Sequence, residues 1–399
     1  MHEEAIGEPT TVPLLAFPLA IIAGAEQLSR HLKRSSITKH MQGKQMPLTT
    51  SNNPISLARQ GSFYVGGRQV TAAGTFESTS AMPSSAGQTY WVDQMYVQYQ
   101  IPVNPRKLPI VLVHGGGCTG RVWETTPDGR EGYATILLRQ GFSVFIVDLP
   151  RGGRSGFPSF TGELGKLDDE QRLVEQRTFA PGREHAWTRW RLGPRYPGTF
   201  HNQAFPMSAV DSFLKGMRPS VTDDPKVMSD ALISLLEEIG PATLVTHSNS
   251  GLYGWLAGAN SNLVRGIVSY EPAFVYPESW KASIRTEERP RSKAGKQPAV
   301  TSISDDSFAR LVDVPMEIVF GDNIPLNPDP NPLADGRRIQ LYVAEEFTQL
   351  VNEQGGRASL LSLPEAGLRG NSHFMFSDIN SIDVAALLCN FLSRHRLDE

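Results

Sequence analysis

Ser248 is the residue of this chain whose surroundings best suit a nucleophile. It lies in residues 244–252 (LVTHSNSGL), between an apolar strand pattern and a helix pattern that begins near Asn249. A serine raised at a sharp turn from strand to helix needs small residues, usually glycine, two positions before and after it. Here those positions hold Thr246 and Ser250, which are small enough for the turn to close. The pattern predicts an exposed, reactive hydroxyl, and a serine-rich helix cap is the alternative interpretation.

A glycine-rich turn, residues 114–120 (HGGGCTG), directly follows the apolar run 108–113. Three consecutive glycines let backbone N–H groups approach a substrate oxygen closely, where they can stabilise negative charge. In acyl transfer one such donor comes from a loop of this kind, and another comes from the residue after the nucleophile. We assign these donors to Gly116 and Asn249, with Gly117 as a further candidate. A turn that serves only to reverse the chain is the alternative.

Acyl transfer also needs a histidine base and a carboxylate that orients it. His373 is the best candidate for the base, because it lies in a loop between the last strand pattern and the last helix pattern. Two carboxylates compete for the role of the acid, since Glu271 ends the strand after Ser248 and Asp322 ends the following strand. We favour Glu271, because it stands at the carboxyl end of a strand beside a rigid proline. His114 and His247 are expected to be structural.

Together these side chains predict acyl transfer to a serine. His373 would take the proton from Ser248 while its oxygen attacks a carbonyl carbon, and water would then hydrolyse the acyl-enzyme. The base must be neutral to act, so activity should rise with pH through the pKa of His373.

The elements that must position these residues alternate along the chain. Apolar strand patterns occur at residues 108–113, 143–148, 242–246, 264–270, 316–320 and 358–363. Helix patterns occur at residues 133–139, 227–239, 341–352 and 382–394. This alternation predicts an α/β fold with a mostly parallel central sheet and helices on both faces. Near the start, Gly66-Gly67 predicts a tight hairpin, and residues 90–101 predict a longer strand, so that the sheet gains an antiparallel edge.

The α/β core is predicted to be interrupted once. We assign residues 59–156 and 223–399 to the core, and residues 157–222, where the alternation stops, to a lid over the carboxyl edge of the sheet. A second irregular stretch, residues 273–307, is expected to add to the same rim. Three aromatic side chains of the lid are candidates for a partly apolar substrate pocket: Trp187, Trp190 and Phe205.

Residues 1–58 form a polar lead-in that contains one apolar run, residues 12–25. The run is too short and too interrupted by proline for a stable membrane span. Its length and its Ala-Gly-Ala end suit a signal peptide, but three glutamates precede it where positive charge is expected. The run therefore predicts either a cleaved signal or a packing helix. The location stays unassigned, with a soluble intracellular protein slightly favoured.

Composition narrows the classes of function. A net charge of −3 over 399 residues, without long runs of like charge, gives no footprint for nucleic acid. Cys118 and Cys389 are too few and too far apart for a disulfide framework, so two free thiols are expected. No metal-ligand spacing and no cofactor fingerprint occur, so we predict neither a metal nor a cofactor.

Three stretches resemble a known group of enzymes. Residues 114–129 (HGGGCTGRVWETTPDG), 270–272 (YEP) and 370–373 (GNSH) resemble those of bacterial carboxylesterases in the α/β-hydrolase superfamily. These enzymes use a glutamate after the sixth strand as the triad acid. The likeness to the superfamily covers about residues 62–394.

The resemblance implies an α/β-hydrolase fold, a homodimer and roles for four residues. The triad would be Ser248, His373 and Glu271, and Gly116 would supply an oxyanion donor. Members of the group can carry adjacent cysteines in the oxyanion turn and be exported. Here two glycines occupy those positions, so neither a disulfide nor export is implied.

The predicted function is a serine hydrolase that cleaves a carboxylic ester or a lactone, with a small ester-like molecule as its partner. The same scaffold supports carbon–carbon bond cleavage and acyl transfer, because a fold does not fix a substrate. A non-catalytic ligand-binding protein on this fold is the third hypothesis.

Overall fold

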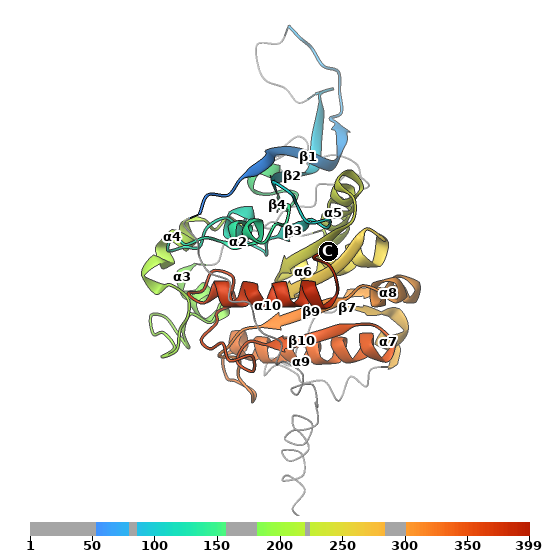
Figure 1. Ribbon diagram of the computed structural model, residues 1–399. Helices are drawn as coiled ribbons and strands as arrows, with labels where there is room; N and C mark the ends of the chain where they lie inside the picture. The colour runs from blue at the N-terminus through green and yellow to red at the C-terminus, as the bar shows by residue number, and fades with distance from the viewer. Residues whose placement is uncertain (1–52, 80–85, 157–181, 220–223, 284–300) are drawn as a thin grey trace, which may run out of the picture. The chain divides into compact units, whose positions relative to one another are not determined.

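The computed structural model describes residues 53–79, 86–156, 182–219, 224–283 and 301–399. Its centre is an eight-stranded sheet in the order β1-β2-β4-β3-β5-β6-β9-β10 (Figure 1). The strands of this sheet are β1 (Leu57–Thr71), β2 (Thr89–Pro102), β3 (Ile110–Val113), β4 (Val144–Asp148), β5 (Ala242–His247), β6 (Val264–Tyr270), β9 (Met316–Phe320) and β10 (Ala358–Ser362). From β4 to β10 all neighbours run parallel, whereas β1 and β2 pair antiparallel. The predicted α/β-hydrolase architecture is confirmed.

Helices connect the parallel strands, and two further strands form a small second sheet. The α-helices in the described residues are α2 (Tyr133–Arg139), α3 (Arg183–Arg189), α4 (Val210–Lys215), α5 (Pro225–Ile239), α6 (Asn249–Asn260), α7 (Glu278–Ser283), α8 (Asp305–Val312), α9 (Pro332–Glu353) and α10 (Ser381–Arg394). The 3-10 helices are η1 (Gly120–Trp123), η2 (Gly153–Ser155) and η4 (Met207–Ala209). The second sheet pairs β7 (Val275–Pro277) with β8 (Thr301–Ile303).

The core lies on both faces of the large sheet. In β3, Val111 and Val113 pack into a cluster with α5, α6, α8 and α9, whereas Ile110 and Leu112 pack into a second cluster with α2 and α10. All four side chains are fully buried, as expected for a parallel strand that is covered on both sides. The continuous apolar runs of the sequence follow directly from this double coverage.

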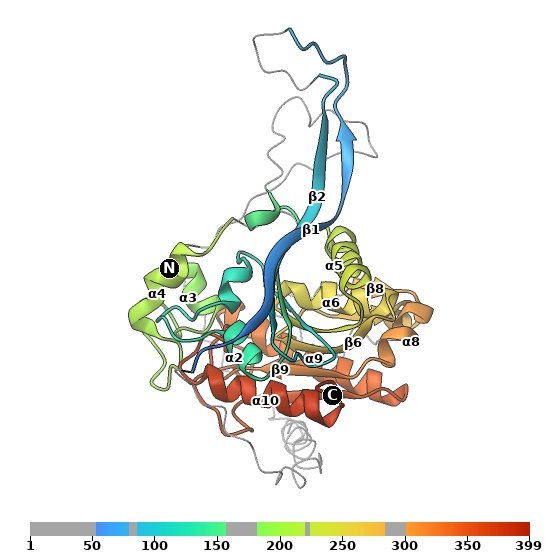
Figure 2. The ribbon, with the colours of Figure 1, turned by 45° about the horizontal axis from the view of Figure 1, so that its top comes forward.

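The hairpin predicted at Gly66-Gly67 is wrong in position. β1 continues through both glycines and pairs with β2, with Val65 opposite Met95. Both glycines have positive φ, 61° and 83°, and Asp93 on the facing strand has a φ of 64°. Positive φ suits glycine, so here it allows a long paired ribbon to deform without reversing. The reversal comes between β1 and β2, and Figure 2 shows the two strands extending past α5.

The predicted helices are present, but α9 is longer than its pattern. It begins at Pro332 rather than near residue 341, because the side chain of Asn331 accepts a hydrogen bond from Leu333 N and Pro332 occupies the first turn. The stretch 273–307 was expected to be irregular. Its described part instead contains β7, α7, β8 and the start of α8.

Much of the predicted lead-in and lid falls outside the described residues. This applies to the apolar run 12–25 and to residues 157–181. The described part of the predicted lid, residues 182–219, contains α3, η4 and α4. The boundaries of lead-in, core and lid stay predictions.

Three findings within the described residues concern membranes, metals and disulfides. None of the described helices combines the length and apolar character needed to cross a membrane. The described side chains include no group of three or more His, Cys, Asp or Glu residues arranged to hold a metal ion. Cys118 and Cys389 are both free thiols.

Candidate active site

Ser248 occupies a strained turn between β5 and α6. β5 ends one residue before it and α6 begins one residue after it, and its φ and ψ are 56° and −120°. Such a conformation costs a non-glycine residue about 1–3 kcal/mol, so the surrounding structure must enforce it. Ser248 N donates to Tyr270 O at 2.9 Å, and Ser248 O accepts from Gly251 N at 3.0 Å and Ala273 N at 3.2 Å. The serine side chain stays partly exposed in this turn.

The turn closes without the usual flanking glycines. Ser250 Oγ accepts a hydrogen bond from His247 N at 2.9 Å and lies 3.0 Å from Val113 O, so its hydroxyl ties the turn to β3. The close approaches fall one position later instead. A Cβ atom on Gly251 would lie 2.2 Å from Pro272 Cβ, a separation that real atoms do not tolerate. The position that requires glycine is therefore Gly251, one residue further along α6 than in the usual motif.

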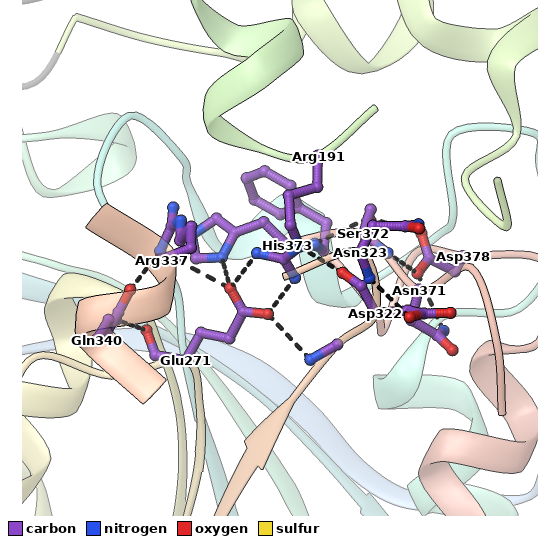
Figure 3. A network of polar contacts seen from close by, with 12 residues as sticks. Arg191, Glu271, Asp322, Asn323, Arg337, Gln340, Asn371, Ser372, His373 and Asp378 are labelled. Carbon is purple, nitrogen blue, oxygen red and sulfur yellow. Dashed lines mark hydrogen bonds and ion pairs between the residues drawn. The ribbon is translucent and has the colours of Figure 1, made fainter. Parts of the chain in front are cut away.

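His373 and Glu271 meet in a buried pair (Figure 3). Nδ1 of His373 lies 2.6 Å from Oε2 of Glu271, and both side chains are almost completely buried. Glu271 follows β6 directly, and its Oε1 also accepts a hydrogen bond from Gly321 N at 3.0 Å. With Nδ1 engaged by the carboxylate, Nε2 of His373 is the nitrogen that can accept a proton from a substrate or a serine.

The pair lies close to the Ser248 turn. His247, the residue before Ser248, is opposite Tyr270, the residue before Glu271, in the parallel pairing of β5 and β6. The rings of His247 and His373 have centroids 4.5 Å apart. Strand register therefore brings Ser248 and Glu271 to the same edge of the sheet, and the loop after β10 brings His373 to the same place.

Electrostatics keep the carboxyl ionised and the imidazole neutral. Burial alone would raise the pKa of Glu271, but the charge of Arg191 and the hydrogen bonds from Arg191 and His373 hold it well below its usual value. Burial, with help from Arg337 and His247, lowers the pKa of His373 well below 6.5, against the opposing effect of Glu271. At neutral pH the arrangement is a carboxylate that holds a neutral histidine, which is the state a general base requires.

Asp322, the alternative acid, has other partners. Its Oδ2 accepts hydrogen bonds from Gly370 N at 2.7 Å and Asn202 Nδ2 at 3.0 Å, and its Oδ1 accepts from Asn323 N at 2.7 Å. Among the described residues no histidine bonds to this carboxylate. The structure thus brings Glu271 to His373 and places Asp322 at the base of the loop that carries the histidine.

The glycine-rich turn packs against the residue that precedes Ser248. A Cβ atom on Gly115 would lie 2.6 Å from His247 Nδ1, so only glycine permits this approach. Gly117 has a φ of 73°, and its carbonyl accepts a hydrogen bond from Arg218 N at 2.8 Å. Gly116 is exposed at the tip of the turn, and Asn249 is exposed at the start of α6. Their role as oxyanion donors stays a prediction.

His114 and His247 are structural, as expected. Nδ1 of His114 donates to Gly115 O at 2.8 Å, and Nε2 accepts from Leu149 N at 3.1 Å. Burial lowers its pKa to about 4. Nε2 of His247 donates to His373 O at 3.0 Å, and burial lowers its pKa to about 3. The ring of His114 links the glycine-rich turn to Leu149, and the ring of His247 links the end of β5 to the His373 loop.

The three candidate pocket aromatics are buried. Trp187 Nε1 donates to Gly198 O at 2.8 Å. Trp190 makes edge-to-face contacts with Phe213 and Phe374, and Phe205 also packs on Phe213. Trp190 packs the 182–219 segment against the His373 loop through Phe374, whereas Trp187 bonds to Gly198 and Phe205 packs on Phe213 within the segment. A contact with substrate stays a prediction.

Two arginines that the sequence did not single out bind Glu271. Arg191 lies two residues after the end of α3, directly after Trp190, and Arg337 lies on α9. Arg191 contacts both carboxylate oxygens, and Arg337 lies 3.7 Å from Oε2. Neither residue belongs to a recognisable motif. An isolated arginine usually lies on a solvated surface, so there was no reason in the sequence to expect these two in a buried site.

Comparisons with known proteins agree on ester hydrolysis. A solved structure described as a novel bacterial esterase is 33% identical, covers 87% of this chain and 99% of its own, and superposes with a TM-score of 0.68. A probable secreted lipase, phiG, from a fungal species is 28% identical over 323 residues, which is 75% of this chain and 86% of the lipase. A pimeloyl-[acyl-carrier protein] methyl ester esterase of Aliivibrio fischeri is 34% identical over 84 residues, 21% of this chain and 27% of that enzyme. No protein-family model matches the sequence.

Proposed function

Since this chain belongs to the serine esterases of the α/β-hydrolase superfamily and acts on carboxylic esters, we propose that Ser248, His373 and Glu271 form its catalytic triad. The observation that carries the proposal is the 2.6 Å contact between His373 Nδ1 and Glu271 Oε2, beside a strained serine. A buried carboxylate that fixes one ring nitrogen of a neutral histidine prepares the other nitrogen to take a proton.

The proposed reaction proceeds through an acyl-enzyme. Nε2 of His373 takes the hydroxyl proton while Ser248 Oγ attacks the ester carbonyl, and the same proton then passes to the leaving alcohol. The tetrahedral oxyanion is held by the N–H groups of Gly116 and Asn249, with Gly117 as a further donor. The start of α6 adds a favourable partial positive charge at this point. Water, activated by His373, finally releases the acid.

Labelling of the nucleophile tests this function. A fluorophosphonate should add one mass adduct to the peptide that contains Ser248, and hydrolysis of p-nitrophenyl esters should disappear in Ser248→Ala. Ser261→Ala, just beyond the other end of α6, is the matched control and should keep full activity. Labelling or hydrolysis that persists in Ser248→Ala would remove the serine from the mechanism.

The preferred acyl group follows from the same assay. The relatives are described as a lipase and as a methyl ester esterase, so we propose that the substrate is a small carboxylic ester. Comparing kcat/KM for p-nitrophenyl esters with acyl chains from acetate to long fatty acids separates a preference for short acyl chains from a preference for the long acyl chains of lipids. A chain that cleaves none of these esters but cleaves a carbon–carbon bond would contradict the proposal.

Location and assembly each have a direct test. Three glutamates precede the apolar run, so we propose retention in the cell, although one relative is described as secreted. Detection of a shortened chain in the medium of its host would contradict this. We also propose a homodimer, which light scattering after gel filtration checks.

A further inference from the structure

Two consecutive residues of the 182–219 segment hold the base and the acid of the proposed triad. Trp190 O accepts a hydrogen bond from His373 N at 2.9 Å. Arg191 Nη1 donates to Glu271 Oε2 at 2.9 Å, while Nη2 donates to Oε1. Arg191 adopts a φ of 57°, which turns its side chain from the end of α3 toward the core. Figure 3 shows its guanidinium facing the carboxylate of Glu271.

The guanidinium of Arg191 is fully engaged and nearly inaccessible. Its Nε donates to Asp322 O at 2.7 Å, and the backbone carbonyl of the same residue accepts from Gln203 Nε2 at 2.7 Å. A planar fork of this kind fixes both oxygens of a carboxylate at once, which a lysine cannot do. Arg191 is therefore built to set the orientation of Glu271.

Arg337 approaches the same carboxylate differently. Its Nη1 lies 3.7 Å from Glu271 Oε2, too far for a hydrogen bond, and instead donates to Gln340 Oε1 at 2.7 Å. Nε and Nη2 donate to Arg189 O at 3.3 and 3.2 Å. Its contact with Glu271 is thus one of charge, not of orientation.

The balance of charge around the pair is positive. The charged or titratable groups that surround it are Arg191 after α3, Arg337 on α9, His247 at the end of β5, and, further out, Arg189, His114, Asp322 and Asp378. Directly against Glu271, two guanidinium groups face one carboxylate. A proton on His373 would add a third positive charge in a buried site, where like charges repel strongly.

We propose that Arg191 and Arg337 are positioning residues of the triad with separate tasks. Arg191 fixes the carboxylate of Glu271 toward His373 by its two hydrogen bonds, and Arg337 opposes protonation of the imidazole by its charge alone. The inference rests on the proposed triad. If the proposal holds, His373 stays neutral in mildly acidic solution, and the orientation of Glu271 depends on the position of α3.

The distances set the size of the charge effect. The guanidinium of Arg337 lies within about 6.3 Å of Nδ1 of His373, because the path between them passes through Oε2 in steps of 3.7 and 2.6 Å. At this separation and an effective dielectric constant of about 20, two unit charges shift a pKa by about one to two units. Burial and then Arg337 are the leading causes of the lowered pKa of His373.

Two variants that keep the cluster paired test the two tasks. Arg337→Gln keeps Arg191 on the carboxylate and should move the acid limb of kcat/KM upward by at least about one pH unit, with the plateau nearly unchanged. Arg337→Lys, its control, keeps the charge and should leave the limb in place. Arg191→Lys also keeps the charge but loses the fork, so kcat should fall by about 10- to 100-fold at constant KM and with an unshifted limb.

Each result has one meaning. An acid limb that stays in place in Arg337→Gln overturns the charge role, and a wild-type kcat in Arg191→Lys overturns the positioning role. Thermal unfolding of each variant confirms that the measured enzyme is folded. Failure of the triad itself would appear separately, as activity that survives in Ser248→Ala.

Discussion

Replacing Glu271 by glutamine separates the two carboxylates that compete for the role of the acid. The change preserves shape and removes one negative charge, so the imidazolium formed during attack loses its counterion. Loss of the charge on a triad acid costs about 10⁴-fold in kcat where the geometry stays intact. Two arginines already offset part of this charge, so we expect kcat to fall by about 10²- to 10⁴-fold in Glu271→Gln.

The same substitution should destabilise the fold. Glu271 is fully buried, and its removal leaves Arg191 and Arg337 without a counterion. Breaking a buried ion pair from one side costs about 3–5 kcal/mol of unfolding free energy. Because the pKa of Glu271 is depressed in the folded protein, its stabilisation is present above its unfolded pKa of about 4.5 and is lost as pH falls through the folded value. The difference between wild type and variant should therefore shrink below about pH 4.5.

Asp322→Asn is the matched control. It alters hydrogen bonds from Gly370 and Asn202 but touches no histidine, so we expect a loss of about 1–3 kcal/mol in unfolding free energy and a kcat within about 10-fold of wild type. Ester hydrolysis at saturating substrate, together with urea unfolding at pH 7 and pH 4, measures both effects. Equal losses of kcat in the two variants, or a larger loss in Asp322→Asn, would refute the reasoning.

Three further predictions concern the wild type and two other sites. The wild-type kcat/KM should hold above the pKa of His373 and fall as pH drops through it, with a midpoint well below pH 6.5; a midpoint at or above that value contradicts the neutral base. Phe205→Ala should lower the unfolding free energy by about 3–5 kcal/mol without changing the acyl-chain preference; a changed preference in an equally stable protein would place Phe205 against the substrate. Burial raises the pKa of Asp378 to about 7, so stability should fall from pH 4 to pH 7 in wild type relative to Asp378→Asn, by about 4 kcal/mol at most; parallel stability curves in urea would contradict this.

The parallel part of the fold was predictable because its strands are covered on both faces. Most strands of this kind appear in the sequence as short, largely apolar runs, and 316–320, apolar except for Glu317, coincides with β9. The antiparallel ribbon of β1 and β2 was harder to predict from the sequence. Most of β1 is exposed, so no apolar pattern showed that Gly66-Gly67 lies inside a strand, and the two glycines favoured a turn.

The candidate site was predictable as far as it is built from strand ends. Ser248 and Glu271 each follow a strand directly, and register alone brings two such positions together. The flanking Ser250 weakened the match to the usual motif, because no sequence rule shows that its hydroxyl bonds to the end of β3. A serine at this position can therefore take the place of the usual glycine, because its hydroxyl stabilises the turn by hydrogen bonds.

The arginines around Glu271 show where sequence reasoning stops, and why. The 182–219 segment was interpreted as part of a lid, with aromatics for the substrate, because Trp187, Trp190 and Phe205 stand out by type. Residue type predicts that such side chains are buried, but not what they are buried against. In the structure Trp190, directly after α3, packs on Phe213 and Phe374, its carbonyl accepts a hydrogen bond from His373 N, and the side chain of the next residue, Arg191, binds Glu271. A segment without periodicity can therefore contribute contacts to residues 80 or more positions away, and only the folded structure shows which carbonyl and which guanidinium make them.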